Sequence, residues 1–396
     1  MVLRWCSAAA ATLLSTLSLS QMKSPAADSL IRDARQKLVP DRRTQVFDIH
    51  ALVEGDSLTV KGDIHSVALR ESLLAYVKER WAGSVADSLV VLPHPSLGGK
   101  TFAVVTVSVA NLRTRPEHSE EMATQVLLGT PLRVLKTGSG WLYVQTPEGY
   151  LGWTDDLIVQ MDQAGYSGWE GKPKVIVTSA YSFAHRDPDP ASPVVSDIVI
   201  GDIFWLRAEK EGYFEVGYPD GRVAYVLKDE GMPLRDWLAG IRATPESVVA
   251  TAKKFFGIPY LWGGTSSKAL DCSGFTKTVY FLNGILLPRD ADQQAAVGDP
   301  VDTSDNFSRL QAGDLLFFGA KATATRKERV THVGISLGGM RFIHESADVH
   351  YNSLDPKESD YSDFRRKGLL RVRRILGSAN GLRFLKDLSY FQSHGL

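Results

Sequence analysis

The chain of 396 residues is poor in cysteine, with only Cys6 and Cys272. Two thiols cannot build a disulfide-rich scaffold, and they are too few for a cysteine-based zinc or iron–sulfur site. Hydrophobic residues make up 44% and charged residues 23% of the chain, which is typical of globular proteins and excludes a largely disordered one. At this length the composition predicts several domains.

Neither sign of charge is in excess, because 45 Lys and Arg residues balance 45 Asp and Glu residues. A protein whose main partner is nucleic acid needs a basic surplus to neutralise phosphates, so we do not expect that class of partner.

Long hydrophobic runs are scarce as well. Residues 8–19, which follow Arg4, form an apolar run that is short for a membrane span, and Ser18 and Ser20 suit signal-peptide cleavage before Gln21. An uncleaved anchor is the alternative. We expect a signal peptide over residues 1–20, no stable membrane span after its removal, and a periplasmic or secreted protein.

Removal of that signal would leave Cys272 as the only thiol of an exported protein. It would have no intramolecular disulfide partner, so it is either a buried bystander or a nucleophile.

The pattern of turns and apolar residues divides the rest of the chain into regions. Residues 21–98 mix helical stripes with strands, which predicts a small α+β domain. Closely spaced short strands predict two small all-β barrels over 99–160 and 172–232 with a Gly-rich linker between them; one larger β domain is the alternative. Helices followed by strands predict an α+β domain over 240–378, and 379–396 is expected as a C-terminal tail.

The two barrel regions share short motifs. Gly149-Tyr-Leu-Gly-Trp in the first corresponds to Gly221-Arg-Val-Ala-Tyr in the second. The first copy also contains Asn111-Leu-Arg-Thr-Arg-Pro and Gly140-Trp-Leu-Tyr-Val, and it resembles bacterial SH3-like domains. We interpret the second copy as a diverged relative.

Cys272 stands where a loop is predicted to become a helix. The free backbone N–H groups and the dipole of a helix N-terminus stabilise an anion, so we expect a lowered thiol pKa. A thiolate that attacks an acyl group also needs a proton acceptor, which His332 and His344 could supply and orient. Zinc binding is the rival use, but one Cys and two His residues without a second set of ligands are a weak metal signal.

The two histidines flank Gly338-Gly339, which predicts a hairpin. In an antiparallel hairpin the numbers of paired residues have a constant sum. A two-residue turn gives 677 and places the histidines on opposite faces, whereas 676 pairs them directly and collects Val333, Ile335, Leu337 and Ile343 on one core face. We therefore predict an odd-length turn with His332 opposite His344.

Several motifs of the last domain resemble the NlpC-type cell-wall cysteine peptidases, which have a papain-like fold. They are Tyr260-Leu-Trp-Gly-Gly, Asp271-Cys-Ser-Gly-Phe, Ala312-Gly-Asp-Leu-Leu-Phe-Phe, His332-Val-Gly-Ile and Phe342-Ile-His-Glu-Ser. The resemblance implies Cys272 as nucleophile, His332 as general base and His344 as the group that orients the base. It also implies that Tyr260 lies beside the oxyanion site, with aromatic packing as the alternative.

Two SH3-like domains before such a peptidase resemble the gamma-D-glutamyl-L-diamino acid endopeptidases of murein peptides, which require a free N-terminal L-Ala. This resemblance implies five substrate-binding residues, Glu121, Tyr150, Asp271, Ser273 and Asp290. A buried ammonium needs carboxylates around it, which fits the set. Alternatively, Asp271 and Asp290 are only helix N-caps and Glu121 is solvated surface. Ala291 stands where some relatives carry Ser.

The resulting prediction is a multidomain cysteine peptidase that binds murein peptides, cuts after gamma-D-Glu and releases L-Ala-gamma-D-Glu without a metal or organic cofactor. Two alternatives remain open, a broader cell-wall amidase or acyltransferase and a murein-binding protein with secondary catalysis. Replacement of Cys272 by alanine distinguishes them, since a binding module keeps its function and an enzyme loses it.

Overall fold

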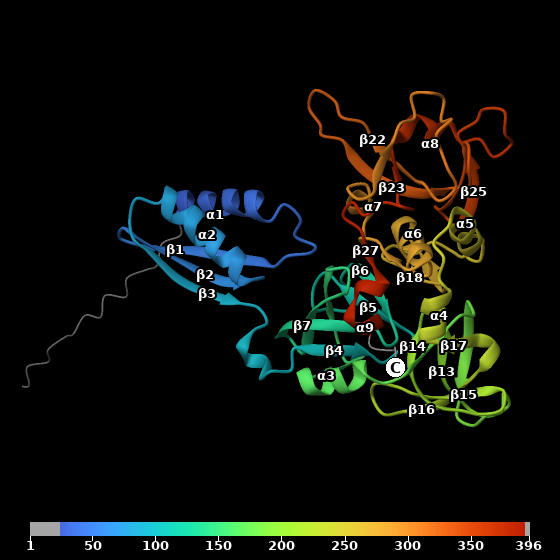
Figure 1. The fold of residues 1–396 in the computed structure, drawn as a ribbon. Helices are drawn as coiled ribbons and strands as arrows, with labels where there is room; N and C mark the ends of the chain where they lie inside the picture. The colour runs from blue at the N-terminus through green and yellow to red at the C-terminus, as the bar shows by residue number, and fades with distance from the viewer. Residues whose placement is uncertain (1–23, 393–396) are drawn as a thin grey trace, which may run out of the picture. The chain divides into compact units, whose positions relative to one another are not determined.

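The computed structural model describes residues 24–392 and forms two compact units that divide after Leu92 (Figure 1). The expected signal peptide and Cys6 lie outside the described residues. Within residues 24–392, none of the helices combines the length and hydropathy that crossing a membrane requires.

The first unit is the predicted α+β domain. Its sheet has the order β1-β2-β3, in which β1 and β2 are antiparallel and β2 and β3 are parallel. Apolar residues of both helices, such as Ile31 and Leu73, share a core with Leu58 and Val60 of the sheet. The elements are α1 (Pro25–Leu38), β1 (Phe47–Glu54), β2 (Ser57–Ile64), α2 (Val67–Arg80) and β3 (Val85–Val91).

The second unit begins with the two predicted barrels. The first has the strand order β6-β5-β9-β8-β7-β4-β10 and the second β13-β12-β16-β15-β14-β11-β17, so corresponding strands occupy corresponding places. The repeat inferred from the short motifs is therefore a repeat of the whole topology. The strands of the first barrel are β4 (Phe102–Val105), β5 (Val109–Arg113), β6 (Met122–Leu127), β7 (Pro131–Gly138), β8 (Trp141–Gln145), β9 (Leu151–Thr154) and β10 (Ile158–Met161). Those of the second are β11 (Lys174–Val177), β12 (Tyr181–His185), β13 (Val194–Val199), β14 (Ile203–Glu209), β15 (Tyr213–Gly217), β16 (Val223–Leu227) and β17 (Gly231–Pro233).

The segment between the barrels is helical, although its glycines favour a loop. Helix α3 (Gln163–Glu170) is capped by Asp162, whose carboxylate accepts from the backbone N–H of Gly165 at 2.8 Å. Tyr166 and Trp169 are buried on one side of it. Their burial stabilises a helix that propensity alone disfavours.

A polar cluster joins both barrels to the third domain. Ser108 of the first barrel donates to Asp197 of the second at 2.9 Å. Lys268 of the third domain donates to Ser108 at 2.9 Å and forms an ion pair with Asp197. The three domains are thus fastened to one another by side chains of each.

The third domain has a papain-like arrangement, in which helices pack against an antiparallel sheet of order β21-β26-β22-β23-β24-β25. Its central helix α6 (Cys272–Phe281) packs against β23 and β24. The other elements are α4 (Leu234–Gly240), α5 (Pro245–Lys253), β18 (Thr265–Ser266), β19 (Ala269–Leu270), β20 (Ile285–Leu286), α7 (Ala291–Gln294), β21 (Asp299–Val301), β22 (Leu315–Ala320), β23 (Arg329–Ser336), β24 (Arg341–Glu345), β25 (Val349–Ser353), α8 (Asp363–Gly368) and β26 (Leu369–Arg374).

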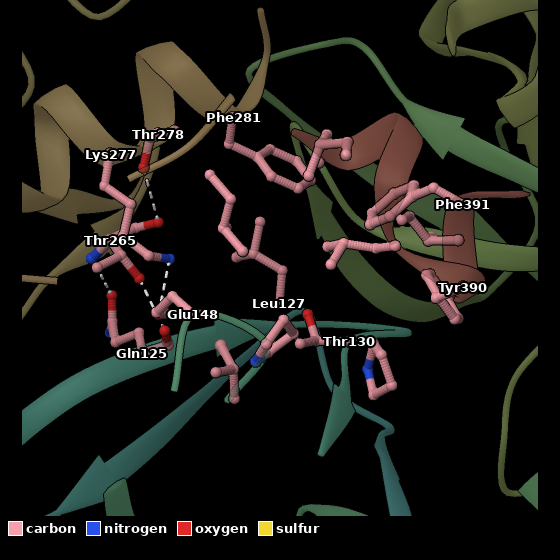
Figure 2. A pocket seen from close by; sticks show the side chains of 18 residues that line it. Gln125, Leu127, Thr130, Glu148, Thr265, Lys277, Thr278, Phe281, Tyr390 and Phe391 are labelled. Carbon is pink, nitrogen blue, oxygen red and sulfur yellow. Dashed lines mark hydrogen bonds and ion pairs between the residues drawn. The ribbon is translucent and has the colours of Figure 1, made fainter. Parts of the chain in front are cut away.

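The segment expected as a tail packs back onto the peptidase domain, where β27 (Arg383–Phe384) pairs with β20, and onto the first barrel. It also forms α9 (Ser389–Gln392), and Tyr390 and Phe391 are buried. The hydroxyl of Tyr390 donates to the backbone oxygen of Gly129 at 2.8 Å. Figure 2 shows both aromatic side chains at a cavity of about 70 Å³ whose lining comes from the first barrel, the second barrel and α6.

Candidate active site

Cys272 is the first residue of α6, and Asp271 is its N-cap. The Asp271 carboxylate accepts from the backbone N–H of Gly274 at 2.7 Å, which holds the first turn of the helix. A side chain at Gly274 would collide with the backbone oxygen of Gly264, so only glycine fits there. The cysteine side chain is 7% exposed. The local sequence therefore fixes a thiol at a helix N-terminus.

His332 on β23 and His344 on β24 point toward each other. His332 Nε2 lies 2.7 Å from His344 Nδ1, and both side chains are buried. The prediction that the two rings share one face is confirmed.

The predicted pairing of the two histidines is wrong by two positions. The strands pair Ile335 with Ile343 and Ser336 with Phe342, so the residue numbers add up to 678 rather than 676. His344 is therefore opposite Gly334, and the rings meet diagonally across that glycine. The turn has an odd length, as predicted, because the backbone N–H of Leu337 donates to the oxygen of Arg341.

Asn352 on β25 is a partner of His344 that the sequence did not indicate. Its Oδ1 lies 3.0 Å from His344 Nε2, and its Nδ2 donates to the backbone oxygen of Asp360 at 3.3 Å. Because Oδ1 is the acceptor, His344 carries its proton on Nε2 and leaves Nδ1 to accept from His332 Nε2–H. His332 then presents a bare Nδ1, as a general base requires.

The charge states differ from the expectation of a lowered thiol pKa. Burial raises the pKa of Cys272 to about 12, and the charge of Asp271 acts in the same direction. Backbone N–H groups of Val333 and Ser273 oppose this rise without outweighing it. Burial also lowers the pKa of His332 well below its usual range. Both shifts favour the uncharged forms, a thiol on Cys272 and an unprotonated imidazole on His332.

Two further ionisable side chains stand near the cysteine. Burial is the main cause of the raised pKa of Tyr260, and the neighbouring Cys272 and Asp271 act in the same direction, so the phenol stays protonated and can donate a hydrogen bond. Glu345 is fully buried, and neither carboxyl oxygen has a partner among the described residues. Burial and the charges of Asp348 and Asp271 raise the pKa of Glu345 to about 8.

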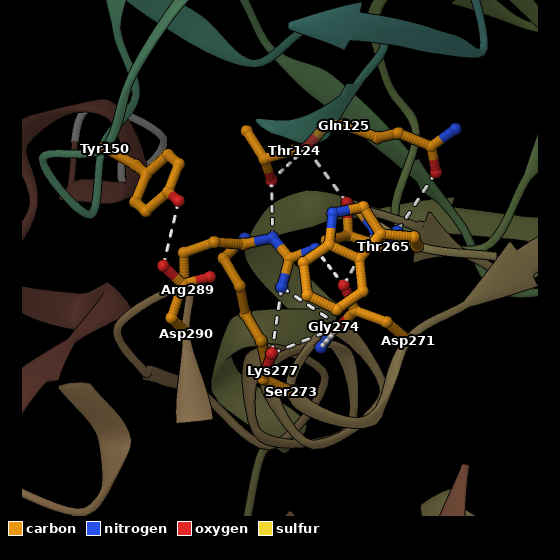
Figure 3. A network of polar contacts seen from close by, with 12 residues as sticks. Thr124, Gln125, Tyr150, Thr265, Asp271, Ser273, Gly274, Lys277, Arg289 and Asp290 are labelled. Atoms are coloured by element: carbon orange, nitrogen blue, oxygen red, sulfur yellow. Dashed lines mark hydrogen bonds and ion pairs between the residues drawn. The ribbon is translucent and has the colours of Figure 1, made fainter. Parts of the chain in front are cut away.

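Arg289 organises the predicted substrate residues of the peptidase domain, and sequence reasoning missed it. It is 1% exposed and donates to both oxygens of Asp271, at 3.1 and 2.5 Å. Asp271 also accepts from Gly263, Ser273 and Gly274, which uses all the acceptor sites of a carboxylate. Asp271 and Ser273 are therefore engaged by protein partners (Figure 3).

The remaining predicted substrate residues form two separate contacts across the boundary between the first barrel and the peptidase domain. Tyr150 Oη donates to Asp290 Oδ2 at 2.9 Å. Trp262 Nε1 donates to Glu121 Oε1 at 2.7 Å, and the indole is 63% exposed. Figure 3 shows Tyr150 and Asp290 beside the Arg289 cluster, into which Thr124 of β6 also accepts from Arg289 Nε at 2.8 Å. The first barrel therefore contributes side chains directly to the site. Separately, within residues 24–392 no group of three or more His, Cys, Asp or Glu side chains is arranged to bind a metal ion.

Comparisons with known proteins agree with this geometry. The sequence profile of the NlpC/P60 family matches residues 257–367, and that of the bacterial dipeptidyl-peptidase SH3 domain matches residues 112–156. Dipeptidyl-peptidase 6 of Lysinibacillus sphaericus is 28% identical over 285 residues, which cover 70% of this chain and 98% of that one. Gamma-D-glutamyl-L-lysine dipeptidyl-peptidase of Bacillus subtilis is 30% identical over 229 residues, which cover 56% of this chain and 71% of that one.

Gamma-D-glutamyl-L-lysine dipeptidyl-peptidase of Bacillus cereus is 31% identical over 235 residues, which cover 57% of this chain and 68% of that one. The chain belongs to the NlpC/P60 family. The crystal structure of an NlpC/P60 family protein from Bacillus cereus superimposes with a TM-score of 0.58 at 25% identity, and the match covers 69% of this chain and 99% of that one.

As an NlpC/P60 member the protein is a cysteine peptidase. Cys272, His332 and His344 lie inside the family match, and so does Asn352. Glu121 and Tyr150 lie inside the SH3-domain match. The two matched segments therefore contain the two halves of the site.

Proposed function

We propose that this peptidase hydrolyses the bond between gamma-D-Glu and the following diamino acid in murein peptides with a free N-terminal L-Ala, and releases L-Ala-gamma-D-Glu. The observation that carries the proposal is the set of acidic side chains at the boundary between the first barrel and the peptidase domain: Glu121 is bonded to Trp262, Asp290 is bonded to Tyr150, and Asp271 directly precedes Cys272. The names of the relatives from both Bacillus species support the same reaction.

Catalysis starts from the neutral pair. As Cys272 Sγ attacks the gamma-carbonyl carbon of D-Glu, its proton passes to His332 Nδ1. His344 accepts from His332 Nε2–H and so stabilises the imidazolium that forms. When the tetrahedral intermediate collapses, His332 gives the proton to the leaving amine and a thioester remains. Water, deprotonated by the same histidine, then hydrolyses the thioester and restores the thiol.

The acidic side chains at this boundary suit an ammonium group. Glu121, Asp271 and Asp290 bring three carboxylates, and Arg289 neutralises one of them, so a net negative charge of two remains. A partly desolvated ammonium binds where carboxylates compensate for lost hydration. In this proposal Glu121, Tyr150 and Asp290 contact the L-Ala ammonium, while Asp271 and Ser273 hold Arg289.

The test compares L-Ala-gamma-D-Glu-L-Lys with its N-acetyl derivative, using mass spectrometry to detect released L-Ala-gamma-D-Glu. We expect the wild type to cleave only the free amine efficiently and Cys272→Ala to cleave neither. Glu121→Gln should lose about 10- to 100-fold in kcat/KM on the free amine, because a charge-assisted hydrogen bond contributes about 1.5–3 kcal/mol.

The matched control is Glu120→Gln. Glu120 is the preceding residue, and its carboxylate lies 3.5 Å from exposed Arg115 rather than against the peptidase domain. Its kcat/KM should stay near that of the wild type. Equal turnover of the free and acetylated peptides would exclude the amine pocket and favour a broader amidase, and murein binding that survives Cys272→Ala with no cleavage by the wild type would favour a binding protein.

We also propose that the enzyme acts outside the cytoplasm, in the periplasm or the medium. The support is Arg4 followed by the apolar run of residues 8–19. Fractionation of producing cells, followed by N-terminal sequencing of the mature protein, tests this. A product that keeps its N-terminal segment and stays in the cytoplasm would contradict it.

A further inference from the structure

Arg365 is a cation that interacts electrostatically with Cys272 and His332, and no ion pair of its guanidinium with a carboxylate occurs among residues 24–392. It belongs to α8, and its Nη2 donates to Ser346 Oγ at 3.3 Å. The side chain is partly buried. A guanidinium removed from water in this way normally has a carboxylate to compensate it.

The Arg365 guanidinium is linked to His332 by packing on the Phe318 ring, which in turn packs on His332. Its Cζ lies 5.7 Å from the centre of the Phe318 ring, and that ring lies 5.9 Å from the ring of His332. Ser346 directly follows β24 and is two residues from His344. The positive charge of Arg365 is the second-largest cause of the lowered pKa of His332, after burial, which agrees with the packing through Phe318.

The helix that carries Arg365 and the barrel that carries Glu121 and Tyr150 lie on different sides of α6, the helix that begins with Cys272 (Figure 1). Glu121 and Tyr150 come from the first barrel, whereas α8 lies at the end of the peptidase domain remote from the barrels, with α6 between them (Figure 1). A peptide whose N-terminus sits at Glu121 and whose scissile bond sits at Cys272 therefore directs its leaving residue toward Arg365.

The chemistry of the leaving residue matches this place. In a diamino acid the α-carboxylate is two bonds from the scissile nitrogen, so it must lie close to the catalytic pair. Arginine presents parallel N–H groups that fit a carboxylate, and the faces of Phe318 and Phe364 keep the guanidinium in place without neutralising it. We propose that Arg365, together with Ser346, binds the α-carboxylate of the diamino acid that is released.

This inference rests on the proposed function and adds a second specificity to it. The enzyme would recognise a free amine at one end of its substrate and a free carboxylate at the other. Peptides whose diamino acid is amidated or extended at its α-carboxyl would then be poor substrates.

The experiment measures kcat/KM for L-Ala-gamma-D-Glu-L-Lys, for its C-terminal amide, and for the aminomethylcoumarin amide of L-Ala-gamma-D-Glu, which has no carboxylate on its leaving group. The wild type should favour the free acid over the amide by about 10- to 100-fold. Arg365→Gln should reduce this ratio to near one, and Arg365→Lys should retain part of it. Lys367→Gln, the same loss of charge on an exposed residue of the same helix, should leave the ratio and the rates as they are.

Three results would overturn the inference. The wild type could cleave acid and amide equally. Arg365→Gln could lower all three rates by the same factor, which would mean that Arg365 acts through Cys272 and His332 instead. Failure of the wild type on every substrate, the coumarin amide included, would refute the proposed function and this inference with it. Circular dichroism melts of both Arg365 variants identify a loss of folding.

Discussion

Asn352 shows how one amide can set the protonation of two histidines. It accepts from His344 Nε2–H and thereby leaves His332 Nδ1 free of its proton. Short-range patterns pointed to Cys272, His332 and His344, because each lies in a distinctive local motif. Asn352 and Arg289 lie in no such motif, and their roles depend on partners brought close by the fold.

We predict that Asn352→Ala lowers kcat by about 10- to 100-fold, since residues that orient a functional histidine have effects of this size. Asn352→Asp places a carboxylate beside His344 and should raise the pKa of the histidine pair. The acid limb of the pH profile of kcat/KM should then move to higher pH. Asn306→Asp, the same substitution at an exposed position of the peptidase domain, is the control. An unchanged acid limb in Asn352→Asp would exclude the tautomer argument.

Glu345 makes stability depend on pH. Its folded-state pKa is raised to about 8 from 4.5 by burial and by the charges of Asp348 and Asp271. The folded protein therefore holds a proton that the unfolded chain loses above about 4.5, and the stability this contributes is lost as pH rises from about 4.5 through about 8.

We expect Glu345→Gln to remove this dependence, because the amide does not titrate. Relative to the wild type, its melting temperature should rise progressively between pH 5 and pH 9, by the equivalent of about 1–3 kcal/mol at the alkaline end. Thermal melts across this range measure the difference. Glu358→Gln, at an exposed position, should show no such trend.

At the scale of elements, the β23–β24 hairpin shows what hydrophobic alternation can and cannot predict. Sums of 676 and 678 place the same residues on the same faces, so the apolar pattern decides the face but not a shift by two. The turn decides the shift, and Gly338 and Gly339, both with positive φ, form the longer loop. Similarly, the glycines of residues 161–173 predicted a linker without regular structure. Helix α3 forms there because Tyr166 and Trp169 are buried by the fold, which the local sequence does not show.

Activity should be sensitive to the addition of even one methyl group at Gly334. A Cβ there would lie 3.0 Å from His344 Cβ and 3.0 Å from Phe342 Cδ2, under the diagonal contact of the two rings. Gly334→Ala should therefore displace His344 and lower kcat by at least about tenfold, with a smaller change in KM. Steady-state kinetics test this. Gly168→Ala in α3, where a Cβ meets nothing within 4 Å, should keep full activity.

At the scale of the whole molecule, a buried ion pair links the first barrel to α6. Lys277 Nζ lies 3.1 Å from Glu148 Oε1 at the edge of the interdomain cavity, and the two side chains are 14% and 5% exposed (Figure 2). Such a pair is sensitive to the loss of one partner, because the other is left as a buried charge.

We predict that Lys277→Met lowers the free energy of unfolding by about 3–5 kcal/mol, whereas the double variant Lys277→Met/Glu148→Leu recovers most of the loss. Urea unfolding of both variants provides the comparison. A single variant as stable as the wild type would show that the domain boundary is open to water.

The contact of the first barrel with the peptidase domain has a consequence for the cell that makes the enzyme. Under the proposed function, Glu121 and Tyr150 close the cleft one residue beyond gamma-D-Glu, so a stem peptide still attached to its glycan strand has no room to enter. The enzyme would then hydrolyse free peptides released during turnover of the wall without cutting the intact murein. The intact murein would be protected by steric exclusion from the cleft, and this protection would depend on the first barrel remaining against the peptidase domain.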